Sequence, residues 1–207
     1  MEGYDKDKKE YLIKGFREGF SIGCSGKVTN KEPKNLQSAY LHPLVVDKKL
    51  QIEIEAGRMI GPFTQPPCDN MVISPIGLHP KKSGDFRLIT HLSHPKGCSI
   101  NDGIPDEQAT VQYASVGDAI TLIKRVGRRS YLAKTDIKSA FRIVPIKPEE
   151  YRLLGIKWRG QYLLDRSLVM GCRSSCKIFE ALSTAIEWIA RNKLNITNMC
   201  HILDDFL

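Results

Sequence analysis

The sequence predicts an α+β fold in which a small antiparallel sheet is backed by helices. Two pairs of apolar runs, each joined by turn residues, predict β-hairpins over 72–89 and 153–164. A shorter hairpin is expected at 201–207, where two aspartates interrupt an apolar run. The order strand, helix, strand around three carboxylates suits helices packed on one antiparallel sheet.

The composition is that of a basic globular chain. Its 207 residues suffice to bury a core, and the net charge is +8. This basic excess favours a polyanionic partner, although it does not separate nucleic acid from an anionic membrane surface. No apolar stretch approaches the roughly 20 residues of a membrane span, and the N-terminus lacks an apolar signal core. We therefore expect an intracellular protein, cytoplasmic or nuclear, that is not secreted, has no membrane partner and keeps its cysteines reduced.

The first half of the chain contains one expected helix and one expected hairpin. Residues 1–35 are rich in Lys, Glu and Gly with little periodicity, which predicts a flexible lead-in. Apolar residues over 41–57 predict a helix, after which Gly-Pro and Pro-Pro pairs give an irregular connection. In the hairpin over 72–89, residues 83–85 supply the turn chemistry. The residues themselves favour a solvated basic turn at its tip, formed by Lys81, Lys82 and Arg87.

The second half contains two expected helices. The first runs from Ser115, a capping residue, to Val126, and Gly127 is placed to end it. A strand over 131–136 follows, and a longer helix begins at Ser174. The apolar faces are Val116, Ala119, Ile120 and Ile123 on the first helix, and Ile178, Leu182, Ile186 and Ile189 on the second.

The Asp204-Asp205 pair is the most informative feature. Its apolar flanks predict that both acids lie at the tip of a tight hairpin within packed structure, although a solvated turn is the alternative. Two unit charges about 4 Å apart repel by roughly 4 kcal/mol at an effective dielectric of about 20, so a neutralising cation is expected. Asp136 ends the strand over 131–136 and supplies a third carboxylate. Such oxygen ligands suit Mg²⁺, and two ions roughly 4 Å apart assist in-line phosphoryl transfer.

Ordered segments extend this pattern over nearly the whole chain. They are Gly15–Phe20, Gly61–Phe63, Pro80–Ile89, Ser99–Ile104, Tyr113–Val116, Asp136–Phe141, Gly171–Ser175 and Leu203–Phe206. In these segments the sequence resembles reverse transcriptases (RNA-directed DNA polymerases), specifically those of DIRS-like retrotransposons that carry a tyrosine recombinase. The resemblance implies template-directed addition of dNTPs to a primer 3′-hydroxyl by two-metal catalysis. It also implies two Mg²⁺ ions, with Mn²⁺ as an alternative, and an RNA or DNA template-primer as partner.

The resemblance further implies the fingers and palm of a right-hand polymerase. A reverse transcriptase domain is expected over 36–207, with fingers at about 36–114 and 146–169 and palm at about 115–145 and 170–207. The family pattern continues past the Asp-Asp motif, and this chain does not carry that continuation. We therefore expect the thumb, the RNase H region and the recombinase region to be absent, as in a fragment of a larger polyprotein or a decayed element.

The resemblance assigns the site residues. Asp136 and Asp204 correspond to the leading metal ligands, Asp205 is a supporting or looser ligand, and the backbone carbonyl of Ile137 is a further ligand. Arg87 is assigned to the triphosphate, as is one of two lysines. The choice between these lysines stays open: Lys81 or Lys82.

Four further assignments concern the nucleotide and template. Phe141 would crowd the sugar 2′ position and so exclude ribonucleotides, whereas the residues alone favour an ordinary core Phe. Arg173 is expected to contact template or triphosphate. The nascent base pair would be lined by Gly171, Ser174 and Ser175, for which a helix N-cap is the structural alternative.

Two other functions compete with an active reverse transcriptase. One is a catalytically inactive nucleic-acid-binding remnant of such an element, which would keep its basic surface but not extend a primer. The other is an RNA-dependent RNA polymerase, because the palm chemistry is shared, although Phe141 argues against it.

Overall fold

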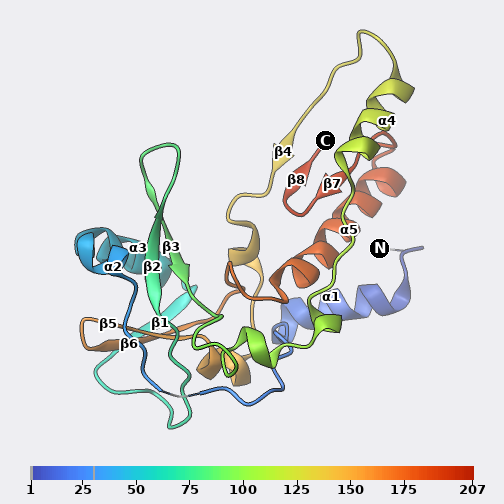
Figure 1. Ribbon diagram of the computed structural model, residues 1–207. Coiled ribbons are helices and arrows are strands. Elements are labelled where there is room, and N and C mark those ends of the chain that lie inside the picture. The colour runs from blue at the N-terminus through green and yellow to red at the C-terminus, as the bar shows by residue number, and fades with distance from the viewer. Residues whose placement is uncertain (1, 30) are drawn as a thin grey trace.

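The computed structural model describes residues 2–29 and 31–207 (Figure 1). The α-helices are α1 (Lys6–Glu18), α2 (Gln37–Leu41), α3 (Pro43–Glu55), α4 (Val116–Val126) and α5 (Ser175–Lys193). The strands are β1 (Met59–Phe63), β2 (Ile76–Pro80), β3 (Phe86–Thr90), β4 (Thr135–Asp136), β5 (Gly155–Trp158), β6 (Gln161–Asp165), β7 (His201–Ile202) and β8 (Asp205–Phe206). Short 3-10 helices lie at Asn101–Gly103, Asp106–Gln108, Ala140–Ile143 and Pro148–Leu153. Helices and antiparallel sheets are therefore combined, as predicted.

The two predicted larger hairpins are confirmed. β2 pairs with β3, with Leu78 opposite Leu88, and β5 pairs with β6, to which β1 adds on the other side. The second hairpin turns at Arg159 and Gly160, whose φ angles of 48° and 76° suit a two-residue turn between twisted strands. These sheets and helices α2 and α3 lie together in Figure 1 and share a buried cluster. The buried residues are Ala39, Val46, Leu50, Met59, Ile76, Leu78, Ile156, Trp158 and Leu163.

Two predicted helices are confirmed as α3 and α5. Helix α3 begins at Pro43, which suits a first helical turn because its missing N–H needs no partner there. Helix α5 carries the third sheet, whose strand order is β4-β8-β7. Phe206 of this sheet packs with Ala190 of α5 and with Met199, so one aromatic ring anchors the sheet to the helix. Of the apolar stripe predicted for α5, Ile178 is buried. The buried positions of the helix are Ser175, Ile178, Phe179, Ser183, Ala185 and Ala190.

The predicted flexible lead-in is wrong, because it contains helix α1. Asp5 caps the helix by accepting a hydrogen bond of 2.9 Å from the backbone N–H of Lys8, and Gly19, at φ 93°, ends it. Leu12 is buried in the largest core cluster, which also includes Phe179 of α5. The helix is polar over most of its surface and few of its residues are buried, so its periodicity is weak in the sequence.

Helix α4 matches its predicted ends but not its predicted burial. Ser115 and Asp118 form a reciprocal capping box, and Gly127 follows the last turn. None of its residues is buried: Val116 and Ile120 are 72% and 47% exposed, and Ala119 and Ile123 are half-buried, so the predicted apolar face packs only in part. The strand predicted over 131–136 is also shorter, since β4 pairs only where the two-residue β8 lies opposite it.

Within the described part of the chain, no helix is both long and apolar enough to cross a bilayer.

Candidate active site

The third sheet gathers the three predicted carboxylates. Asp136 of β4 lies directly opposite Asp205 of β8, and the backbone N–H of Ile137 donates a 3.1 Å hydrogen bond to the Asp204 carbonyl. Strands β7 and β8 form the predicted tight hairpin, in which Leu203 has a left-handed φ of 53°. Residues separated by almost 70 positions in the sequence therefore lie at one end of a small sheet.

The carboxylates are electrostatically coupled. Partial burial raises the pKa of Asp204, and the negative charges of Asp136 and Asp205, with a hydrogen bond to Asp136, raise it further. The Lys134 ammonium lies 3.0 Å from an Asp205 oxygen, and this contact raises the lysine pKa, with smaller contributions from the other two aspartates. The site thus attracts cations, and Asp205 already has one.

The donor chemistry fits Mg²⁺, although only two of the acids are free of a cation. Among residues 2–29 and 31–207, no three His, Cys, Asp or Glu side chains converge closely enough to hold a metal. Mg²⁺ commonly uses one or two protein carboxylates and fills its other positions with water and substrate phosphates. Asp136 and Asp204 meet that requirement, and neutralisation by a cation would relieve the repulsion that raises the Asp204 pKa.

Two of the predicted triphosphate-binding residues share a pocket of about 400 Å³. Lys81 and Arg87 line it together with Ser139 and Arg142, which follow Asp136, and Met170. An Nη of Arg87 lies 3.4 Å from the Met170 sulfur, so this side chain of β3 reaches the loop before α5.

The remaining basic residues of the hairpin differ in their freedom. The Lys81 ammonium lies 3.6 Å from the Asp85 carboxylate, and the Lys49 ammonium lies 2.8 Å from it. The hydrogen bond from Lys49, and to a smaller extent one from the backbone, lowers the pKa of Asp85 to about 2. Lys82 is exposed at the turn and does not line the pocket. Lys81 is therefore the lysine that the fold brings to Arg87.

Phe141 is half-buried and packs edge-on against Phe179 of α5, with ring centroids 5.3 Å apart. This contact accounts for the ring as a core residue, the reading that its sequence context alone favours.

The two serines of the 171–175 loop face inward. The Ser174 hydroxyl donates a 2.7 Å hydrogen bond to the Ile22 carbonyl, and the Ser175 hydroxyl donates one of 2.7 Å to the Val169 carbonyl. Both residues are about 1% exposed, and Ser174 occupies the N-cap position of α5 without capping it. Their hydroxyls therefore hold the loop in place and are not directed toward a base pair.

Gly171 and Arg173 lie at the surface of the same loop. Gly171 has a φ of 97°, which favours glycine, and its carbonyl accepts a 2.8 Å hydrogen bond from Asn101. The Arg173 guanidinium donates to the Ile104 carbonyl at 3.0 Å and pairs with Asp106. Any contact of Arg173 with template or triphosphate would have to compete with this ion pair.

Sequence reasoning missed a partly buried ion network beside the pocket that Arg87 lines. Arg142 donates to both carboxylate oxygens of Asp165 at 2.9 Å and to Glu53 at 2.8 Å, and Glu53 also accepts from Arg58 at 2.7 Å. The network joins α3, β6 and the 3-10 helix that follows Asp136. The available signal was charge within apolar sequence, namely Arg142 in Ala-Phe-Arg-Ile-Val and Asp165 after two leucines.

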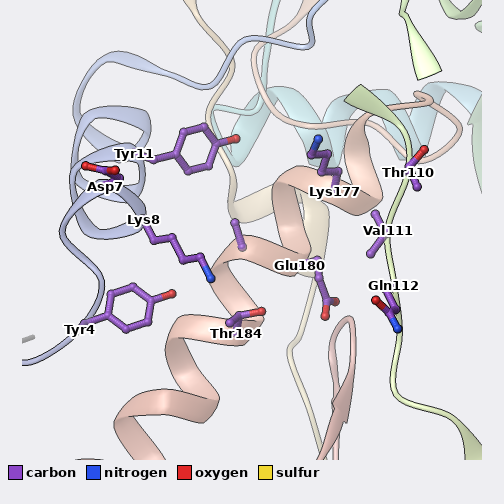
Figure 2. A pocket seen from close by; sticks show the side chains of 11 residues that line it. Tyr4, Asp7, Lys8, Tyr11, Thr110, Val111, Gln112, Lys177, Glu180 and Thr184 are labelled. Atoms are coloured by element: carbon purple, nitrogen blue, oxygen red, sulfur yellow. The ribbon is translucent and has the colours of Figure 1, made fainter. Parts of the chain in front are cut away.

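A second cavity, of about 420 Å³, lies between α1, residues 110–112 and α5 (Figure 2). Tyr4, Tyr11 and Glu180 are among its lining side chains, and none of the three aspartates of the sheet borders it. It is separate from the pocket beside Arg87.

Solved structures with a similar fold include foamy virus protease-reverse transcriptases. The prototype foamy virus protease-reverse transcriptase matches with a TM-score of 0.62 and 21% identity, over 90% of this chain and 22% of that chain. A foamy viral protease-reverse transcriptase in complex with double-stranded DNA matches with a TM-score of 0.65 and 15% identity, over 99% and 35%. The same kind of protein in complex with an RNA/DNA hybrid matches with a TM-score of 0.59 and 15% identity, over 99% and 27%.

These likenesses establish a reverse-transcriptase-like fold. This chain spans 22–35% of the length of those chains. No protein-family model and no curated protein matches the sequence.

Proposed function

We propose that this chain is the fingers and palm part of an RNA-directed DNA polymerase, which adds dNTPs to a primer 3′-hydroxyl along an RNA or DNA template. One observation carries the proposal: Asp136 lies opposite Asp205, with Asp204 beside them, in a reverse-transcriptase-like fold. The net charge of +8 further favours a polyanionic partner. The complexes of similar proteins with DNA and with an RNA/DNA hybrid support the same partner class.

In this proposal each group has a chemical role. Asp136 and Asp204, with the Ile137 carbonyl, would hold Mg²⁺, and Asp205 would contribute negative charge tempered by Lys134. Bound Mg²⁺ supplies activation of the attacking hydroxyl and stabilisation of the leaving oxygen. Arg87 binds triphosphate oxygens with its forked guanidinium, and Lys81 neutralises them as a point charge.

Phe141 supplies selectivity in this proposal. Its ring is fixed on one side by Phe179, so it cannot yield readily to a ribose 2′-hydroxyl. Exclusion by a clash, rather than by a lost contact, would favour dNTPs.

The test is primer extension on an RNA template with dNTPs and Mg²⁺. The parent chain is compared with Asp204→Asn, which removes one carboxylate charge at nearly constant volume, and with Asp69→Asn as a matched control at an exposed position. Extension by the parent and by Asp69→Asn, but not by Asp204→Asn, is the expected result. Extension that survives Asp204→Asn would refute the site.

The second candidate is an inactive nucleic-acid-binding remnant. The fact that favours it is that no three acids converge at metal-binding distance in the described residues. Its signature would be RNA binding by both parent and Asp204→Asn, steeply weakened by salt, with extension by neither. Origin from a DIRS-like retrotransposon is likewise a proposal, which rests on the ordered sequence segments.

A further inference from the structure

His201 is held by two acidic side chains of α5. It lies on β7, directly before the turn that carries Asp204, and its Nε2 is 3.0 Å from a Glu180 oxygen. Its Nδ1 contacts Glu187, and its ring stacks on Phe206 with centroids 5.3 Å apart and an interplanar angle of 26°. Three independent contacts therefore fix one imidazole.

This arrangement is enclosed. The His201 side chain is 9% exposed, and the two glutamates are 17% and 20% exposed. Glu180 and Glu187 lie seven positions apart, about two helical turns, and so project from the same face of α5. Polar contacts shielded from water are stronger than those at a surface, and they are costly to break on one side only.

A third residue of α5, Arg191, binds the chain just before β7. Arg191 holds Glu187, with 2.6 Å between Nε and the carboxylate, and donates to the Met199 and Thr197 carbonyls. Glu180 also lines the cavity of Figure 2. Within the described residues, the Glu180 Oε2 is buried without a hydrogen-bond partner, and the Glu180 Oε1 contacts His201.

The hairpin needs such an anchor. β7 and β8 are two residues each, and an isolated hairpin is marginal in water even when it is longer. Beyond the paired positions, Cys200 and Leu207 exchange two backbone hydrogen bonds of 2.9 Å. Pairing with β4 covers two residue pairs, and the Ile137 N–H adds a 3.1 Å hydrogen bond to the Asp204 carbonyl, so few backbone hydrogen bonds hold Asp204 relative to Asp136.

We propose that His201 is a positioning residue, which clamps the Asp204-Asp205 hairpin onto α5 through Glu180 and Glu187. This inference deepens the proposed function and rests on it for its catalytic consequence. The clamp itself is a property of the fold and is measurable without catalysis.

The experiment is amide hydrogen exchange of the 200–207 segment, followed by mass spectrometry, in the whole chain. The variants are His201→Ala, His201→Gln and, as a matched control, His79→Ala on the exposed end of β2. Losing the clamp should raise the exchange rate of this segment about tenfold or more in His201→Ala, because local opening becomes easier. His201→Gln, which keeps one amide donor, should recover part of the protection, and His79→Ala should match the parent.

Exchange in His201→Ala within about twofold of the parent would overturn the proposal. If His201→Ala fails to fold, Glu180→Met with Glu187→Met keeps side chains of similar length, removes both acceptors and must raise exchange in the same segment. Primer extension gives a separate result: kcat should fall about tenfold in His201→Ala with the KM for dNTP nearly unchanged, and recover in part in His201→Gln. A kcat of His201→Ala equal to that of the parent would also overturn the positioning role of His201. A parent chain that extends no primer would refute the proposed function while the exchange result still decides the clamp.

Discussion

Removing Arg142 should destabilise the protein far more than removing an exposed arginine. In Arg142→Met, Asp165 loses both 2.9 Å contacts, while its side chain is only 8% exposed. It keeps one hydrogen bond, from the Ser167 N–H at 3.0 Å. Breaking one side of a buried ion pair costs about 3–5 kcal/mol, because a charge is left without a partner in a medium of low polarity.

The contribution of Glu53 to this cost is smaller. Glu53 retains Arg58, whose Nε lies 2.7 Å from the carboxylate. We therefore expect a loss of about 3–5 kcal/mol in the free energy of unfolding, which is a large part of the roughly 5–15 kcal/mol typical of a domain. The loss should be measured by urea unfolding with linear extrapolation.

Two controls separate this mechanism from a general loss of arginine. Arg159→Met removes an exposed ion pair with Asp47, at 3.0 Å, and should cost no more than about 1 kcal/mol. The double variant Arg142→Met with Asp165→Leu removes both charges and should recover most of the stability. A loss in Arg142→Met that is no larger than that in Arg159→Met would refute the reasoning.

The loss in the free energy of unfolding of Arg142→Met should also depend on pH. Burial raises the pKa of Asp165, and in the variant the charge and hydrogen bonds of Arg142 no longer oppose this effect. A raised pKa means that the folded state holds its proton more tightly, so stability falls as the pH rises above the ordinary value of 3.8. The difference between variant and parent should therefore shrink as the pH is lowered toward that value.

Three further predictions concern the site and its partner. Burial and the neighbouring acids raise the pKa of Asp204, so the charged side chain destabilises the fold at pH 7. In EDTA at pH 7, Asp204→Asn should therefore raise the Tm slightly, by less than the equivalent of about 1 kcal/mol, and the gain should vanish below pH 3.8. A lower Tm in the variant would contradict this. Mg²⁺ at about 100 times its Kd should stabilise the parent by about 2.7 kcal/mol in thermal unfolding and leave Asp204→Asn unchanged. Phe141→Val should increase rNTP incorporation relative to dNTP incorporation in single-nucleotide assays. Lost packing on Phe179 should lower the free energy of unfolding by about 1–2 kcal/mol. Unchanged discrimination between rNTP and dNTP would favour an RNA polymerase or a purely structural Phe141.

Local signals in the sequence predicted local structure well. The turn at Arg159-Gly160, the capping box of Ser115 and the hairpin around Asp204 each depend on residues within a few positions of one another. Their geometry is set by backbone preferences and short-range hydrogen bonds, which the order of residues encodes directly.

Predictions failed where a residue's partner lies far away in the chain. Ser174 was expected at a substrate surface, but its hydroxyl bonds to Ile22, and helix α1 was missed because it needs α5 to give it a buried side. Conversely, the apolar residues of α4 have periodicity, but none of them is fully buried. Periodicity states which residues share a face and not whether anything packs on it.

The sequence by itself determined helices α3, α4 and α5, the hairpin turns and the three acids, because periodicity, turn chemistry and residue type act over short distances. The tertiary structure alone decided which charges are neutralised. In the fold, Arg142 binds Glu53, which lies 89 positions earlier, and Lys134 binds Asp205. Glu180 and Glu187 contact the two ring nitrogens of His201. These pairings follow from the packing of whole helices and sheets, since burial makes an unpaired charge costly and only the assembled fold specifies which groups are buried together.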